Sequence, residues 1–193
     1  MKTRSIRRAP RGFTLVELLV VISIIIVLAA MSLGGIQIAQ KKAKTLQTQS
    51  DATALYQAIE QYYQEYSKLP GVESNSDEIE TVGESGVELL TILLGKEDDT
   101  GKMQNPRKIP FLNVKEGKNA KKGGLVYSNG GSGGQIEGLY DAWGKPFRVK
   151  LDTEYEGEID DPIVQGNVVR NKNAIVYSYG PDGKLGTDDV KTW

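Results

Sequence analysis

The chain has 193 residues, with 24 Lys and Arg against 25 Asp and Glu, and it contains no Cys and no His. This length fits one domain, or one domain with an appendage, and the formal charge of −1 does not indicate a nucleic-acid-binding protein. Without Cys there is no disulfide framework, thiolate zinc site or cysteine nucleophile. Without His the commonest general base and transition-metal ligand are missing. The composition therefore excludes Ser-His-Asp, Cys-His and imidazole-ligated metal chemistry.

The N-terminal segment departs from this balanced composition. Residues 1–12 carry five basic side chains and no acid, and residues 13–31 form an apolar run in which Glu17 is the single charged residue. A helix of that length spans roughly 28 Å, close to the hydrocarbon thickness of a bilayer. A cationic flank places the N-terminus of such a segment in the cytoplasm. Three interpretations are open here: a cleaved secretory signal, an uncleaved anchor, or a prepilin-type signal cut before the apolar run.

The stretch GFTLVE at residues 12–17 favours the third interpretation. It resembles the type IV prepilin signature, in which a basic leader ends in Gly and Glu is the fifth residue of the mature chain. The resemblance implies that a prepilin peptidase cuts between Gly12 and Phe13 and methylates the new N-terminus. It also implies that Glu17 pairs with the free amine of Phe13 on a neighbouring subunit and so sets the stagger between subunits. The alternative is that the Glu17 carboxylate extends to the lipid headgroups.

A helical pattern continues beyond the apolar run. From Ile36 to Tyr66 apolar side chains recur at spacings of three and four, which is typical of an amphipathic helix, and Leu69-Pro70-Gly71 is expected to end it. Gly34 and Gly35 mark a soft point within the pattern. The sequence therefore predicts one long hydrophobic helix, with a transmembrane or filament-core half at 13–35 and an amphipathic half at 36–70.

Residues 71–193 are expected to form a globular domain with an α+β fold. The motif Ser85-x-x-Glu88 matches a capping box and predicts a short helix over 86–94. Two prolines favour an extended conformation for 105–112. Apolar or alternating runs predict strands at 125–127, 147–151 and 174–179. We expect these strands to form a small antiparallel sheet of three or four strands that packs on the exposed half of the long helix.

Charge is segregated along this domain. Between Lys102 and Lys122 there are seven basic residues and one acid, and between Asp152 and Asp161 there are six acids and no base. A solvated loop face is the simpler interpretation of the basic stretch, and a contact with an anionic surface or a neighbouring subunit is the alternative. Adjacent carboxylates such as Asp160 and Asp161 could serve a glycosidase, but in a hydrophilic loop they are usually just solvated.

The C-terminal stretch is the best candidate for a site. Asp182, Asp188 and Asp189 lie close together in the sequence with three glycines among and around them. Hard cations such as Ca²⁺ bind carboxylate and backbone carbonyl oxygens, and glycines allow a short loop to fold back so that these oxygens converge. From composition alone, an ordinary turn with an exposed acidic tip is the simpler interpretation.

Two C-terminal segments carry a closer resemblance. DAWGKPF at 141–147 and SYGPDGKLGTDD at 178–189 are similar to segments of the major pseudopilins of type II secretion systems, although Ala142 stands where that family usually has Pro. The resemblance implies a structural calcium ion held by Asp182, Asp188 and Asp189, with carbonyl oxygens near Tyr179 and Leu185.

The motifs together imply a filament subunit rather than an enzyme. The resemblance implies a pilin fold and a major pseudopilin that polymerises with itself into a periplasmic filament driving type II protein secretion. The subunit would cross the inner membrane once, with a cytoplasmic N-terminus and a periplasmic globular domain. Its other partners would be the prepilin peptidase, the assembly platform of the inner membrane, minor pseudopilins and, before assembly, membrane lipid; no nucleic acid is expected. The alternative is a structural or DNA-uptake type IV pilin, and the absence of Cys together with the calcium loop favours the pseudopilin.

Overall fold

The computed structural model describes residues 12–72, 77–98, 101–129, 131 and 133–193, without the side chains of 31–35. The leader predicted at residues 1–12 lies outside the described residues except for Gly12. The chain divides into two compact units, Met1–Lys42 and Ala43–Trp193. Helix α1 (Leu15–Tyr66) contributes its first part to one unit and its second part to the other.

The described part of the first unit is helical from Leu15 onward. The helix continues without a break through Gly34 and Gly35, so the predicted soft point is not a break in the helix. Apolar side chains occupy nearly every position between Leu15 and Leu28, and the large ones are 46–79 % exposed, so the helix is apolar on all its faces. Among the described residues, no helix is long and apolar enough to pass through a membrane.

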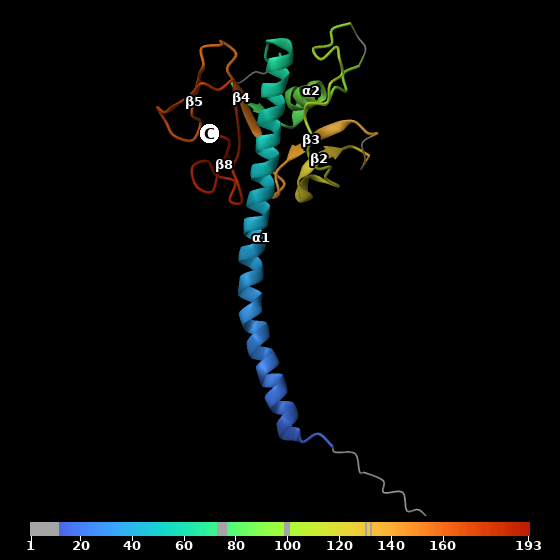
Figure 1. The fold of residues 1–193 in the computed structure, drawn as a ribbon, viewed down its shortest axis with the longest axis vertical. Helices are drawn as coiled ribbons and strands as arrows, with labels where there is room; N and C mark the ends of the chain where they lie inside the picture. The colour runs from blue at the N-terminus through green and yellow to red at the C-terminus, as the bar shows by residue number, and fades with distance from the viewer. Residues whose placement is uncertain (1–11, 73–76, 99–100, 130, 132) are drawn as a thin grey trace, which may run out of the picture. The chain divides into compact units, whose positions relative to one another are not determined.

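The described residues of the second unit form three antiparallel sheets and two further helical segments (Figure 1). The largest sheet has the order β1-β4-β7-β8, and two hairpin pairs, β2 with β3 and β5 with β6, complete the unit. The strand bounds are β1 (Ile79–Glu80), β2 (Gly124–Tyr127), β3 (Ile136–Tyr140), β4 (Arg148–Leu151), β5 (Glu158–Asp160), β6 (Val168–Arg170), β7 (Ala174–Ser178) and β8 (Val190–Lys191). The helical segments are α2 (Gly83–Leu93) and the 3-10 turn η1 (Ala120–Lys122).

The core of this unit forms around the second part of α1. One stripe of the helix is completely buried, and it packs against α2, β2, β3, β4 and β7 in a single apolar cluster; the stripe is Ala52, Leu55, Ala58, Ile59 and Tyr62. The spacing of these residues, three or four apart, is the one that the sequence pattern predicted. The structure thus confirms an α+β fold in which a long N-terminal helix packs on a small antiparallel sheet domain.

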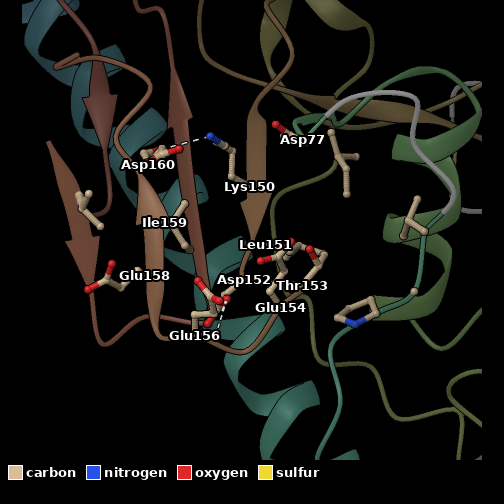
Figure 2. A pocket seen from close by; sticks show the side chains of 15 residues that line it. Asp77, Lys150, Leu151, Asp152, Thr153, Glu154, Glu156, Glu158, Ile159 and Asp160 are labelled. Atoms are coloured by element: carbon tan, nitrogen blue, oxygen red, sulfur yellow. Dashed lines mark hydrogen bonds between the residues drawn. The ribbon is translucent and has the colours of Figure 1, made fainter. Parts of the chain in front are cut away.

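The edge of β4 is only partly covered by β1. Ile79 and Glu80 of β1 pair with Val149 and Arg148 of β4. Among the described residues, no residue of β1 pairs with the rest of β4, which is Lys150 and Leu151. A groove of about 670 Å³ lies at this point (Figure 2). It opens between the end of β4, strand β5, the start of β1 and the chain that leaves α1 at Pro70.

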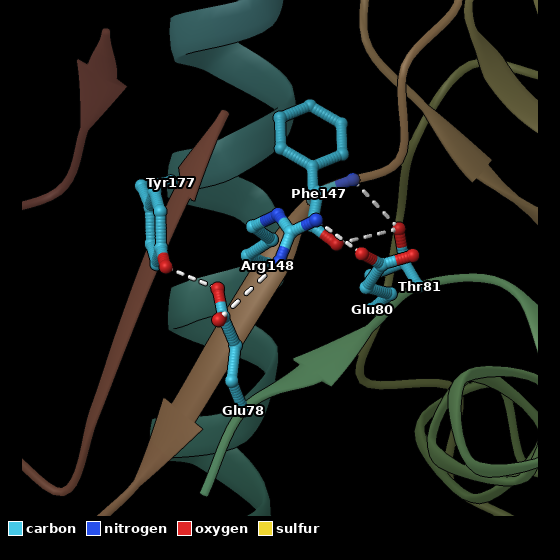
Figure 3. Close-up of polar contacts among 6 residues, drawn as sticks. All are labelled: Glu78, Glu80, Thr81, Phe147, Arg148 and Tyr177. Carbon is cyan, nitrogen blue, oxygen red and sulfur yellow. Dashed lines mark hydrogen bonds and ion pairs between the residues drawn. The ribbon is translucent and has the colours of Figure 1, made fainter. Parts of the chain in front are cut away.

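A polar network fixes β1 to the middle of the sheet (Figure 3). The Arg148 guanidinium forms ion pairs with Glu78, at 3.3 Å, and with Glu80. Glu78 also accepts a hydrogen bond from the Tyr177 hydroxyl, so that β1, β4 and β7 are joined. The buried Thr81 hydroxyl accepts the Phe147 N–H at 2.9 Å and donates to the Leu139 carbonyl at 2.6 Å. Burial and the Glu78 hydrogen bond raise the pKa of Tyr177 far above its ordinary value.

Two sequence-based expectations about local structure are wrong. Helix α2 begins at Gly83, with extended Val82 at its N-cap and no side-chain cap bond, so Ser85 and Glu88 do not form the predicted capping box. The first turn of α2 packs so closely on β1 that a Cβ on Gly86 would lie 2.1 Å from the Glu80 carbonyl oxygen. The acid-rich stretch 152–161 contains strand β5, where the sequence indicated a loop.

Candidate functional site

The N-terminal motif is organised around a capping box at the start of α1. The Glu17 carboxylate accepts the Thr14 N–H at 2.9 Å and the Thr14 hydroxyl at 2.8 Å. In return, the Thr14 hydroxyl oxygen accepts the Glu17 N–H at 3.2 Å. The pattern Thr14-x-x-Glu17 before an apolar run is itself a sequence signature of a capping box, and it reveals a role for Thr14 that the sequence analysis missed.

The two predicted processing residues lie directly before this cap. Gly12 and Phe13 are outside the helix and exposed, and the Phe13 side chain is 78 % exposed. An exposed peptide bond outside regular secondary structure is accessible to a peptidase. Helix α1 begins at Leu15, so cleavage after Gly12 would leave the capping box and the helix intact.

The C-terminal loop is held closed by two of its three predicted aspartates. Asp182 accepts the Lys184 N–H at 3.1 Å and the Thr187 hydroxyl, and these bonds lower the pKa of Asp182. Asp189 accepts the Gly186 N–H at 2.6 Å through one carboxylate oxygen. The Asp188 side chain is exposed. The backbone of Asp188 packs tightly against Gly180, so that a Cβ added to Gly180 would lie 2.1 Å from the Asp188 carbonyl oxygen.

The three aspartates do not form a compact group of carboxylates. Within the described residues, no group of three or more acidic side chains is arranged to hold a metal ion. One observation nevertheless fits a cation: the other carboxylate oxygen of Asp189, Oδ1, is buried and has no hydrogen-bond partner among the described residues. A buried carboxylate oxygen without a partner is energetically costly, and a bound cation would offset that cost.

A buried aspartate that the sequence analysis did not single out anchors the loop to the sheet. Asp141 is completely buried and accepts the N–H groups of Trp143 and Lys145, at 2.8 and 2.9 Å. Its second oxygen accepts the Ser178 hydroxyl, and the Ser178 oxygen accepts the Gly180 N–H at 3.1 Å. The two segments that carried the resemblance, 141–147 and 178–189, are therefore joined directly by Asp141 and Ser178.

A comparison with protein-family models gives one match. The prokaryotic N-terminal methylation motif matches residues 7–33. This match supports a type IV pilin-like family. It indicates a type IV pilin-like precursor, suggests a structural protein rather than an enzyme, and implies processing by a prepilin peptidase and assembly into pilus-like filaments.

The matched segment is a small part of the chain, and it lies outside the second unit. No curated protein and no solved structure matches the chain significantly. The comparisons therefore support the general class of protein, and they do not distinguish a pseudopilin from a pilin.

Proposed function

We propose that the chain is a major pseudopilin, which polymerises through α1 into a periplasmic filament that drives type II protein secretion. The observation that carries this proposal is the methylation motif at residues 7–33, placed directly on the start of a 52-residue helix. Cleavage after Gly12 would produce a subunit that begins with Phe13 and continues into the capping box of Thr14 and Glu17.

The first part of α1 supports polymerisation. A helix that is apolar on every face and exposed along its length needs to be covered, either by lipid or by other helices. In this proposal lipid covers it before assembly, with the N-terminus cytoplasmic and the second unit periplasmic, and neighbouring subunits cover it in the filament. The assembly platform and the minor pseudopilins would be partners in that transfer.

Glu17 is proposed to bind the free amine of Phe13 on the adjacent subunit. We expect Glu17→Ala to be inserted and processed but to assemble poorly, because a registering charge pair is lost while the apolar surface is kept. The matched control is Glu84→Ala, which removes an exposed acid from the first turn of α2. Electron microscopy of filaments is the measurement, and normal filaments from Glu17→Ala would contradict the pairing.

The proposal of a major pseudopilin is tested by deleting the chain in its host. Loss of secreted enzymes with unchanged surface pili supports the pseudopilin. The reverse result supports the alternative, a structural or DNA-uptake type IV pilin, which would share the same N-terminal motif.

A calcium ion is proposed for the C-terminal loop, held by Asp182, Asp188 and Asp189. The orphaned Oδ1 of Asp189 and the oxygen-rich, glycine-containing loop support it. Bound calcium would tie residues 182–189 together and make the loop more rigid. A ligand present at 100 times its dissociation constant stabilises the fold by about 2.7 kcal/mol, so the melting temperature should rise in calcium and fall in chelator.

The calcium proposal needs a variant that removes the ligand charge without changing the shape of the loop. Asp189→Asn should abolish the calcium-dependent rise in melting temperature, and exposed Asp160→Asn should leave it unchanged. Equal melting temperatures in calcium and in chelator, for the unaltered chain, would argue against a metal in the loop.

A further inference from the structure

The groove beside the end of β4 is lined by apolar and by acidic side chains. The apolar ones are Val72, Ile79, Leu151, Ile159 and Val168. Six acidic residues, which we call the acidic rim, and a single lysine, Lys150, are also part of the lining. Lys150 donates to the backbone carbonyl of Asp160 at 3.3 Å. Four of the six carboxylates are exposed and form no ion pair among the described residues; they are Asp77, Glu154, Glu156 and Asp160 (Figure 2).

The acidic rim is fixed in place by its own hydrogen bonds. Buried Asp152 accepts the N–H groups of Glu156 and Gly157, at 3.1 and 2.7 Å, and so closes the turn that carries Glu154 and Glu156. The Tyr155 hydroxyl of the same turn accepts the Leu69 N–H at 3.0 Å, which fixes the turn to the chain leaving α1. A rim that is ordered before binding loses less entropy when a partner docks.

Within the described residues, the groove also borders an edge of β4 that has no paired strand. In the antiparallel register of β1 and β4, the backbone N–H and C=O groups of Val149 and Leu151 point to the same side, toward β1. Strand β1 pairs with Val149 but does not extend to Leu151. The backbone carbonyl of Leu151 can therefore accept a hydrogen bond from a lysine side chain that enters the groove beside the carboxylates.

A complementary basic surface lies at the other end of the same unit. Lys118, Lys121 and Lys122 are exposed around η1, and none forms an ion pair with a described residue. This segment contacts the turn after Asp141, since a Cβ on Gly144 would lie 3.1 Å from the Lys121 Cα. The same turn reaches α1 at Thr48, whose hydroxyl accepts the Ala142 N–H at 3.2 Å.

The two surfaces are separated along the axis of α1. The basic segment contacts the turn that is hydrogen-bonded to Thr48, and the groove includes residues just after the helix end at Tyr66. At 1.5 Å per residue, Thr48 and Tyr66 are about 27 Å apart, which is too far for the lysines of one copy to reach the groove of the same copy. Acidic and basic surfaces at opposite ends of a unit suit a head-to-tail contact, which propagates as an open filament.

We propose that the acidic groove beside β4 binds the lysine segment around η1 (residues 118–122) of a second copy of this chain. This inference rests on the proposed function, because a head-to-tail contact along α1 is useful to a subunit that forms filaments. The lysine side chains lie against Glu154, Glu156 and Asp160, and the apolar lining residues of the groove accommodate their methylene stems. The contact adds an electrostatic link between globular units to the association of the N-terminal helices.

The absence of native cysteines allows a direct test by crosslinking. The full chain carrying both Glu156→Cys and Lys121→Cys is produced with its assembly machinery and oxidised. The expected result is a ladder of disulfide-linked multimers, because each copy offers one cysteine at each end. The control pair, Glu156→Cys with Glu84→Cys, should remain monomeric. The proposal would be overturned if the control pair formed multimers and the test pair did not. It would also be overturned if the test pair crosslinked to a different basic protein instead of to a second copy.

Charge reversal tests the chemistry of the contact. Lys118→Glu, Lys121→Glu and Lys122→Glu together should abolish filaments, and so should Glu154→Lys, Glu156→Lys and Asp160→Lys together. Combining all six changes in one chain should restore filaments, which misfolded variants would not do. If Glu17→Ala abolishes filaments while either triple variant assembles normally, the proposed function stands and this contact is wrong. If the unaltered chain forms no filaments, the proposed function fails first.

Discussion

At the scale of single residues, buried Asp141 is the main polar anchor of the second unit. Its carboxylate joins the turn at 141–145 to the last residue of β7 and, through Ser178, to the start of the C-terminal loop. A buried carboxylate is tolerated only when hydrogen bonds replace its water, and three donors do so here. The folding of both resembling segments thus depends on one side chain.

We expect Asp141→Ala to destabilise the fragment 43–193 by about 3 kcal/mol, because three donors lose a charged acceptor inside the protein. Urea unfolding followed by circular dichroism measures the change. The matched control is Asp160→Ala, an exposed aspartate for which a change within about 0.5 kcal/mol is expected. Equal unfolding midpoints for the two variants would show that Asp141 is not an anchor.

Asp161 makes the stability of the same unit depend on pH. Burial alone would raise its pKa, but hydrogen bonds from Asn167, Ile163, Trp193 and Val164 outweigh that effect and lower the pKa to about 2. A carboxyl group whose pKa is lower in the folded state than in the unfolded chain stabilises the fold above its unfolded value, near 3.8. That stabilisation, about 2 kcal/mol, is lost as the pH falls from roughly 5 toward 2.

The pH prediction is read from a difference between two proteins. The fragment 43–193 should lose more stability than its Asp161→Asn variant when urea midpoints are compared at pH 7 and pH 3, because the variant has no carboxyl to protonate at that position. The comparison cancels the contributions of other acids, including Asp51, whose pKa burial raises. Parallel pH profiles would contradict the assignment of the lowered pKa to Asp161.

At the scale of elements, the end of α2 is set by a glycine in a left-handed conformation. Gly95 has φ +63°, and the Lys96 N–H donates back to the Thr91 carbonyl at 3.0 Å, as in a Schellman motif. The backbone of Lys108 packs directly against Gly95, so that an added Cβ would lie 2.6 Å from the Lys108 carbonyl oxygen. This contact joins α2 to the segment 105–112.

Gly95→Ala should therefore destabilise the fragment by about 3 kcal/mol, from the left-handed backbone and the steric clash together. Gly166→Ala is the control, since Gly166 also has a positive φ, +79°, but has open space where a Cβ would be. The control should lose only about 1 kcal/mol, from the backbone term alone. Thermal unfolding separates the two, and equal losses would mean that the contact with Lys108 can relax.

The elements also show what sequence patterns can predict. The strands around 125–127, 147–151 and 174–179 were found because apolar runs mark strands that are buried by their neighbours. Strand β5 was missed because its sequence, Glu158-Ile159-Asp160, matches a solvated loop. Strand β5 is stabilised by its partner β6, through the Ile159–Val169 pair and a 2.8 Å ion pair between Glu158 and Arg170. Because this partner comes from a later part of the chain, the pairing leaves no pattern in the sequence of β5 itself.

The candidate site was predictable to a similar extent. The methylation motif could be recognised from residue types in fixed order, and the family match at residues 7–33 agrees with that recognition. The role of Glu17 in assembly stays a prediction. The burial of Asp141 could not be recognised, because its partners Lys145 and Ser178 come together only when two distant turns meet. The groove has the same origin, since its acidic residues come from the turn before β5, from β5 and from Asp77, while the unpaired edge of β4 depends on where β1 begins.

At the scale of the whole molecule, the near-neutral charge is a difference between two parts of opposite charge. The segment 1–12 contributes five positive charges, and without it the chain has 19 basic residues against 25 acidic ones, a formal charge of −6. Subunits of like charge repel one another when they are packed in a filament. Separating acidic and basic surfaces to opposite ends of the second unit allows acidic subunits to attract along one direction.

The proposed removal of the leader predicts a specific change in the assembled protein. Filament subunits should consist of residues 13–193 with one added methyl group on Phe13, and they should focus at a lower isoelectric point than the full chain, because five positive charges are gone. Intact-mass spectrometry and isoelectric focusing of purified filaments provide both measurements. Replacing Gly12 with Leu should leave the leader in place and prevent assembly, whereas Arg11→Lys, which keeps the charge, should be processed normally. Filaments built from full-length, unmethylated chains would show that the leader is an anchor rather than a processing signal.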